Sequence, residues 1–182
     1  MNSLPCSPGV DFKKLSLMEA LDLAVTVEEE ARDRYVELAD ALSIAHTPEA
    51  SEFFRKMARM EEKHRVALLT KRRASFGDRP STVGRLQIFD IEAPDYDTVR
   101  VFMTVRQALE VALQSERKAR AFFKAALAET TDLEARFLFA ELVAEESDHE
   151  AYVLAELARQ ATDPWGDPPG DPADYSDEPV SQ

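Results

Sequence analysis

Two Glu-x-x-His motifs are the residues of this chain best suited to metal chemistry. They span Glu61–His64 and Glu146–His149, and one further glutamate precedes each of them, Glu28 and Glu116 respectively. Residues three apart share one face of an α-helix, so each motif directs a carboxylate and an imidazole the same way. Carboxylate oxygens with one imidazole per metal suit Fe or Mn better than the tetrahedral sites typical of Zn.

All of these residues interrupt apolar stripes of helical period. In the second predicted helix, the residues that recur at spacings of three and four are Phe54, Met57, Glu61, His64 and Leu68. Similar stripes surround Glu28, Glu116 and the Glu146–His149 motif. Each of these carboxylates and imidazoles is therefore predicted to face the interior of the protein.

Four long helices are predicted to carry these stripes, at about 16–42, 47–74, 97–129 and 131–159. Capping-box patterns at Ser16–Glu19 and Thr131–Glu134 mark the starts of the first and fourth helices. Short connections within the first and last pairs predict two antiparallel hairpins. The connection over 76–96 is long enough to cross the whole bundle. The predicted fold class is all-α, a four-helix bundle of two hairpins joined by one crossover.

The predicted domain organisation is one bundle over 16–161 with an extension at each end. Residues 1–15 form the N-terminal extension, and residues 162–182 form a tail with six acidic residues and five prolines. We expect that tail to be disordered, since it cannot bury apolar surface.

The loop positions also predict where the six candidate residues meet. The midpoints between each upstream glutamate and its motif fall in the two short loops, so each glutamate lies level with its motif. Two hairpins packed face to face would then bring all six groups to mid-bundle. Four buried carboxylates are costly unless two divalent ions neutralise them. The alternatives are an exposed polar face or a polar core satisfied by hydrogen bonds.

Composition narrows the class of protein and its partners. The net charge of −13 disfavours nucleic acid or an anionic membrane surface as a partner. The single cysteine, Cys6, excludes an intramolecular disulfide and a Cys-x-x-Cys metal site. No apolar run approaches the length of a membrane-spanning helix, so a soluble cytoplasmic protein is expected.

The residues that carry the metal hypothesis also resemble a known family. Glu28-x-x-Ala31-Arg32-x-x-Tyr35, Met60–His64 and Val143–Glu150 resemble helix motifs of the rubrerythrin branch of the ferritin-like superfamily. The resemblance covers about 16–160 and implies a ferritin-like bundle. The metal ligands that it implies are Glu28, Glu61, His64, Glu116, Glu146 and His149.

Three departures from related patterns refine that expectation. A chain with one cysteine cannot build the four-cysteine rubredoxin domain of full rubrerythrins, so a peroxidase would need an external electron donor. Ala119 stands where these proteins usually carry an additional glutamate, which leaves a six-ligand site. Glu62 stands where bacterioferritins place a haem-binding methionine, so no haem is expected.

The resemblance implies a dinuclear iron oxidoreductase that oxidises Fe(II) with H₂O₂ or O₂, as a peroxidase or a ferroxidase. The two ions would be Fe, with Mn or a mixed Fe/Mn pair as the alternative. Tyr35 would either hydrogen-bond a ligand carboxylate or supply an electron during oxidation, or it would be a core aromatic whose hydroxyl has a backbone partner. A homodimer is expected.

The same residues are compatible with three other functions. One is iron storage, delivery or sensing without catalytic turnover, and another is manganese catalase-like dismutation of peroxide. A metal-free helical scaffold is the third.

Overall fold

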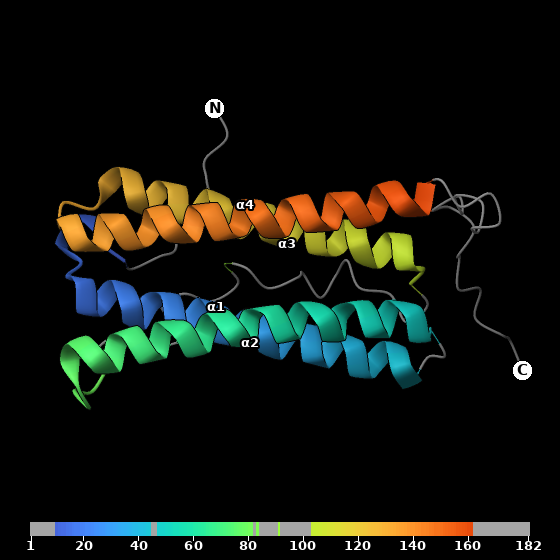
Figure 1. The fold of residues 1–182 in the computed structure, drawn as a ribbon, viewed down its shortest axis with the longest axis horizontal. Coiled ribbons are helices and arrows are strands. Elements are labelled where there is room, and N and C mark those ends of the chain that lie inside the picture. The colour runs from blue at the N-terminus through green and yellow to red at the C-terminus, as the bar shows by residue number, and fades with distance from the viewer. Residues whose placement is uncertain (1–9, 45–46, 82, 84–90, 92–102, 162–182) are drawn as a thin grey trace, which may run out of the picture.

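The computed structural model describes residues 10–44, 47–81, 83, 91 and 103–161 (Figure 1). A short 3₁₀ helix, η1 (Phe12–Lys14), precedes four long helices. These are α1 (Leu17–Ile44), α2 (Pro48–Phe76), α3 (Val105–Glu129) and α4 (Leu133–Ala161). The described residues contain no strand, and the all-α prediction is confirmed. The predicted acidic tail and most of the predicted crossover lie outside the described residues.

Local capping interactions set the helix starts. At α1, the Ser16 amide donates to Glu19 Oε2 at 2.9 Å and the Glu19 amide donates to Ser16 Oγ at 3.4 Å, as the capping box predicts. A reciprocal box of Thr104 and Gln107 starts α3. The C-terminal end of α2 is capped by Gly77, which adopts φ +64°, a conformation that favours glycine. The Gly77 amide donates to the Arg73 carbonyl.

Two predicted helix starts are wrong. The third helix begins at Val105 rather than near residue 97, because Thr104 has extended backbone and caps the helix there; residues 97–102 lie outside the described part. The fourth helix is capped by Asp132, whose Oδ1 accepts from the Ala135 amide at 2.9 Å. Thr131, the predicted cap, instead donates its hydroxyl to the Lys13 carbonyl.

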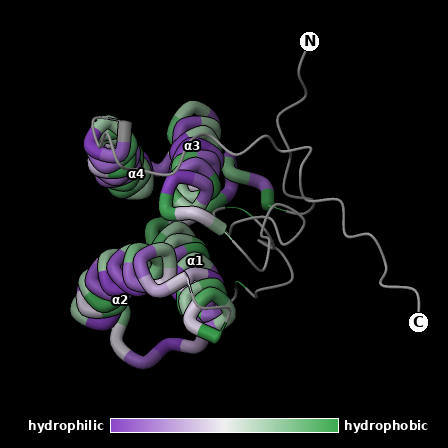
Figure 2. The backbone as a smooth tube through the Cα atoms, turned by 90° about the vertical axis from the view of Figure 1, so that its right-hand side faces the viewer, coloured by the Kyte–Doolittle hydropathy of each residue, from purple (hydrophilic) through white to green (hydrophobic). Residues whose placement is uncertain are grey.

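The helices form two antiparallel hairpins, α1 with α2 and α3 with α4. Figures 1 and 2 show the two hairpins stacked as two layers of a four-helix bundle. The C-terminal end of α2 and the N-terminal end of α3 lie at opposite ends of the bundle (Figure 1). The chain between them must therefore traverse its length, as the predicted crossover requires.

The apolar core consists of two separate clusters, one toward each end of the bundle. The largest fully buried members of the first cluster are Leu21, Leu23, Phe123, Phe139, Leu138 and Leu142. Those of the second cluster are Tyr35, Leu42, Phe54, Met57 and Leu109. On every helix, the predicted metal ligands fall between the segments that supply the two clusters. We call this level of the bundle the polar layer; it contains Glu28, Glu61, His64, Glu116, Glu146 and His149.

In the part of the chain that the structure describes, no helix combines the length and the hydrophobicity needed to cross a membrane.

Candidate metal centre

Each of the four helices buries one glutamate in the polar layer. Glu61 and Glu116 are 0% exposed, and Glu28 and Glu146 are 1% exposed. These positions face inward because each glutamate replaces an apolar residue in the stripe of its own helix. For Glu61, the stripe continues with buried Met57 on one side and buried Leu68 on the other. Four carboxyl groups without solvent contact at one level are costly unless cations or hydrogen bonds compensate them.

The imidazole of His149 points into this group of carboxyl groups. Its Nδ1 lies 3.1 Å from Glu116 Oε2, 3.6 Å from Glu61 Oε1 and 4.0 Å from Glu146 Oε2. Glu61, Glu116 and His149 each offer a ligand atom, and these atoms lie within 4.8 Å of one another. Two donors that share one ion at about 2.1 Å are at most about 4.2 Å apart. Small side-chain adjustments would therefore let these three residues share one ion.

Glu28 lies at the same level and carries a perturbed carboxyl group. Burial raises its pKa to about 7, while Glu61 and the imidazoles of His64 and His149 act in the opposite direction. Its Oε2 is buried and forms no hydrogen bond within the described part of the structure. A bound cation would give this oxygen a partner and favour the ionised carboxylate. The oxygen-rich donor set therefore fits divalent Fe or Mn.

His64 lies at the edge of the polar layer and is oriented differently from His149. Its Nε2 is 3.3 Å from His149 Nε2, but its Nδ1 is 3.2 Å from Glu145 Oε2. The hydrogen bond with Glu145 is the main reason that the pKa of His64 is raised. The structure thus places all six predicted ligands in one layer, while His64 lies outside the cluster of Glu61, Glu116 and His149.

Glu145 is a residue of this site that the sequence reasoning missed. It directly precedes the Glu146–His149 motif, but it belongs to no apolar stripe. Only the packing of α4 against α2 reveals that its carboxylate reaches His64. No signal in the sequence separated Glu145 from the neighbouring charged residues.

Tyr35 contacts the polar layer from the second apolar cluster. Its hydroxyl donates to Glu116 Oε1 at 2.7 Å, and its ring stacks on Phe54 at a centroid distance of 5.7 Å. The side chain is 0% exposed. Tyr35 can therefore orient the Glu116 carboxylate while Glu116 Oε2 faces His149; its part in any reaction stays a prediction.

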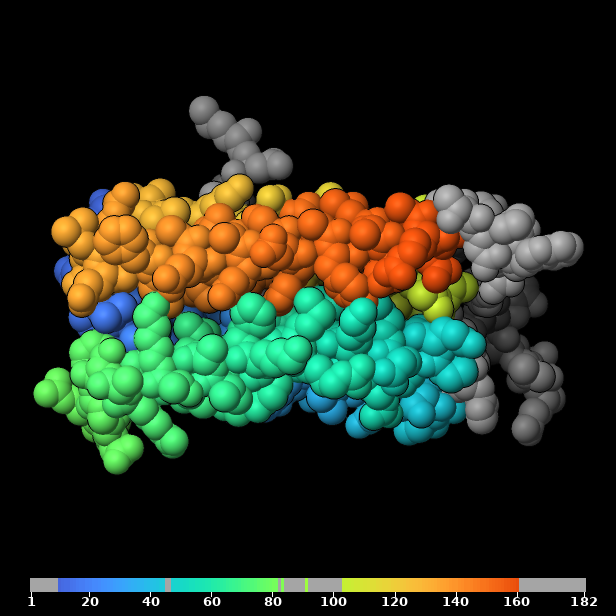
Figure 3. Space-filling model, in the orientation of Figure 1, coloured from blue at the N-terminus to red at the C-terminus, as the bar shows by residue number. Residues whose placement is uncertain are grey.

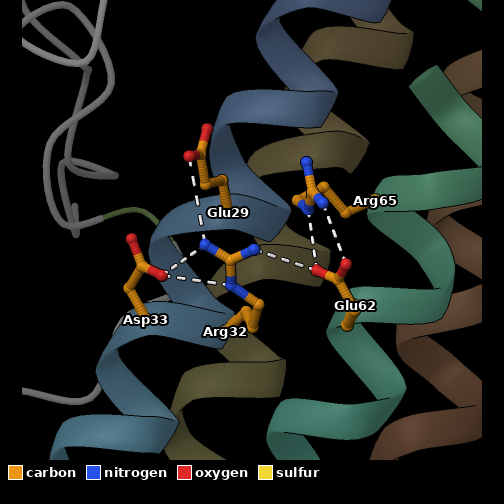
Figure 4. A network of polar contacts seen from close by, with 5 residues as sticks. All are labelled: Glu29, Arg32, Asp33, Glu62 and Arg65. Atoms are coloured by element: carbon orange, nitrogen blue, oxygen red, sulfur yellow. Dashed lines mark hydrogen bonds and ion pairs between the residues drawn. The ribbon is translucent and has the colours of Figure 1, made fainter.

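A charged network beside the polar layer joins α1 to α2 (Figure 4). Arg32 donates to Glu62 Oε2 at 2.9 Å and also pairs with Glu29 and Asp33. Arg65 donates to both carboxylate oxygens of Glu62. The hydrogen bonds from Arg65 and Arg32 lower the pKa of Glu62 to about 2. These residues hold the hairpin together just outside the buried carboxylates.

The other hairpin has a comparable network around Glu150. Arg117 and Arg120 approach its two carboxylate oxygens at 2.8 Å and 2.7 Å. Arg32 and Arg120, which follow the glutamates of α1 and α3 by one turn, are therefore ion-pair residues. Both hairpins are reinforced by arginine–carboxylate pairs beside the polar layer.

A four-helix bundle with one crossover and a buried layer of glutamate and histidine is the architecture of ferritin-like metal-binding proteins. Residues 19–157 match the sequence model of the rubrerythrin family, and the chain belongs to that family. The prediction from the helix motifs is confirmed.

Solved structures of similar proteins agree on the fold. An uncharacterized conserved protein from Magnetospirillum magnetotacticum, known from a crystal structure, is 28% identical in sequence to this chain. The two structures superpose with a TM-score of 0.64, and the match covers 80% of this chain and 95% of that one. A hypothetical protein from Pyrococcus furiosus, at 22% identity and a TM-score of 0.54, shares the fold over 82% of this chain and 95% of its own. No curated protein matches the chain.

Proposed function

We propose that the protein binds two iron ions in the polar layer and oxidises Fe(II) with H₂O₂ or O₂. The observation that carries the proposal is the burial of one glutamate from each helix at one level, with three of the four carboxyl groups within 4.0 Å of His149 Nδ1. Membership of the rubrerythrin family supports the same assignment. Two divalent cations would neutralise the four buried carboxyl groups, which favours a metal-binding site in this layer.

The residues of the layer divide into two groups that would each hold one ion. Glu116, Glu146 and His149 would hold one ion, and Glu28, Glu61 and His64 would hold the other. Tyr35 would keep Glu116 oriented, since it already donates to Oε1 of that carboxylate. Glu145 would orient His64 by accepting from its Nδ1, or would release it when the second ion binds.

Two bound Fe(II) ions would supply the electrons for the reaction. Reduction of one H₂O₂ to two waters takes two electrons and two protons, and one electron from each Fe(II) balances it. With O₂, the same two electrons and two protons yield H₂O₂. The buried side chains exclude bulk water and hold the carboxylates, and an external electron donor would return the irons to the ferrous state in a peroxidase.

Anaerobic loading with Fe(II), followed by separate addition of H₂O₂ and O₂, tests the proposal. We expect about two irons per chain by metal analysis and a rise in ferric absorbance with at least one oxidant. Glu61→Gln should lower the iron content, because it removes a buried ligand. Glu62→Gln is the matched control, since the adjacent carboxylate lies in the Arg32 network outside the layer.

Several results would contradict the proposal. Binding of far fewer than two irons per chain would contradict the proposed site, and so would equal iron content in the Glu61→Gln and Glu62→Gln variants. Slow oxidation with iron accumulating far above two per chain would instead favour storage. Manganese in protein purified without added metal, together with release of O₂ from peroxide, would favour a catalase-like enzyme.

A further inference from the structure

A small pocket opens between α2 and α4 and adjoins the polar layer. Its volume is about 110 Å³, which is room for several molecules of the size of water. Buried Leu68, Leu138 and Leu142 line its floor. His64 and Glu145 form its wall on the side of the polar layer. In Figure 3, α2 and α4, the two helices that supply the lining of this pocket, both lie on the face toward the viewer.

His64 is the side chain that connects the pocket to the buried carboxylates. Its side chain is 24% exposed, whereas the other five residues of the polar layer are at most 5% exposed. Its Nε2 lies 3.3 Å from His149 Nε2. Among the six residues of the polar layer, His64 therefore provides the contact with solvent, and a reactant that arrives by the pocket meets this imidazole first.

The charges around the pocket are arranged in pairs that bridge the two helices. Lys71 Nζ of α2 lies 2.8 Å from Glu141 Oε2 of α4, and His64 Nδ1 lies 3.2 Å from Glu145 Oε2. Each acidic side chain of the lining thus faces a basic partner, and the floor between the two pairs is apolar. A lining of this kind favours a small uncharged molecule over a hydrated metal cation, which would have to shed its water against leucine side chains.

From these features we infer that the pocket is the entry site for the small uncharged oxidant, H₂O₂ or O₂, and that His64 and Glu145 form the inner end of this path. The inference rests on the proposed function for the identity of the reaction, but the pocket can be tested separately.

Ala67 offers a way to close the pocket without changing the polar layer. It lines the pocket but is exposed, so Ala67→Phe adds bulk at the mouth. Ala140 is also exposed and does not line the pocket, and it lies on the opposite side of α4 from Leu138 and Leu142; Ala140→Phe is therefore the matched control. Circular dichroism and thermal melting would verify that both variants fold, with Ala67→Leu as the smaller replacement.

The first test uses metal-free protein with labelled leucine methyl groups under O₂ pressure. Dissolved O₂ enhances NMR relaxation of the methyl groups that it contacts. We expect a several-fold larger enhancement at Leu138 and Leu142 than at Leu42 and Leu109, which are equally buried in the second cluster. Ala67→Phe should remove the difference and Ala140→Phe should retain it. Equal enhancement at all four leucines in the wild-type protein would overturn the inference.

The second test uses the iron-loaded protein and separates the two oxidants. Ala67→Phe should slow oxidation by H₂O₂, by O₂ or by both several-fold, while iron content and the anaerobic rate of Fe(II) binding stay unchanged. An unchanged oxidation rate, or an equal loss in the rate of Fe(II) binding, would overturn the inference. If the wild-type iron-loaded protein reacts with neither oxidant, the proposed function fails, and the relaxation experiment still decides whether O₂ enters the pocket.

Discussion

Replacing Glu28 with glutamine is expected to change how the stability of the metal-free protein depends on pH. The Glu28 side chain is buried in the polar layer, and burial raises the pKa of its carboxyl group from 4.5 to about 7. Between these two pH values, the folded protein holds a proton that the unfolded chain has lost. The free energy of unfolding should therefore fall as the pH rises through this window.

The size of the effect follows from the two pKa values. A shift from 4.5 to about 7 corresponds to about 3 kcal/mol when both states are fully ionised. The linkage relation gives a destabilisation of about 1 kcal/mol at pH 5 and about 3 kcal/mol at pH 8. Glutamine has nearly the shape of the protonated side chain and does not ionise, so the variant should gain about 2 kcal/mol over the wild type between pH 5 and pH 8.

Urea denaturation of chelator-treated protein at pH 5 and pH 8 measures this difference. Comparison of the variant with the wild type at each pH removes the contributions of groups elsewhere in the chain. Glu37→Gln serves as the control on the same helix, because 58% of the Glu37 side chain is exposed. If Glu28→Gln changes the free energy of unfolding equally at the two pH values, the burial argument is refuted.

Four further predictions concern the polar layer, its metal and its surroundings. Tyr35→Phe removes the hydrogen bond to Glu116 and should cost about 1 kcal/mol of stability in urea denaturation of metal-free protein; no loss would show that the hydroxyl does not support the carboxylate. Chelation should lower the melting temperature of the iron-loaded protein, since free metal at 100 times its Kd stabilises the fold by about 2.7 kcal/mol, and an unchanged melting curve would argue for a metal-free scaffold. Glu62→Gln should cost less than about 1 kcal/mol at pH 7, because the ion pairs are partly exposed. Its lowered pKa of about 2 means that this contribution is present above pH 4.5 and disappears as the pH falls toward 2, which an acid titration of stability would check. Phe139→Ala should cost about 3–5 kcal/mol, since the ring is 0% exposed in the first apolar cluster, and a loss below about 1 kcal/mol would contradict the packing.

Helical periodicity predicted most of the fold. The apolar stripes of the four helices, the capping box at Ser16 and Glu19 and the short loops were sufficient to predict two hairpins. The starts of the third and fourth helices were predicted less well, because several Thr and Asp residues near each start could serve as caps. Thr104 and Asp132 are selected by the backbone conformation and by contacts such as that of Thr131 with Lys13.

Local spacing also placed the six residues of the polar layer at one level of the bundle. The stripes determine which face of a helix a residue occupies, and the loop positions determine its height along the bundle axis. Both quantities depend on short stretches of chain, so the sequence alone predicts them. The identity of the residues further indicates oxygen-rich metal chemistry.

The tertiary structure decided how these residues meet. The His64 imidazole faces Glu145 while that of His149 faces Glu61 and Glu116, although the two motifs look equivalent in the sequence. The pocket between α2 and α4 likewise exists only because side chains of two distant segments meet. Periodicity sets the face of each helix, but the rotation of one helix against another and the side-chain rotamers depend on contacts between residues far apart in the chain. For this reason, the sequence of this protein determines the polar layer, and only the packed bundle determines which of its groups are buried together and which one reaches the surface.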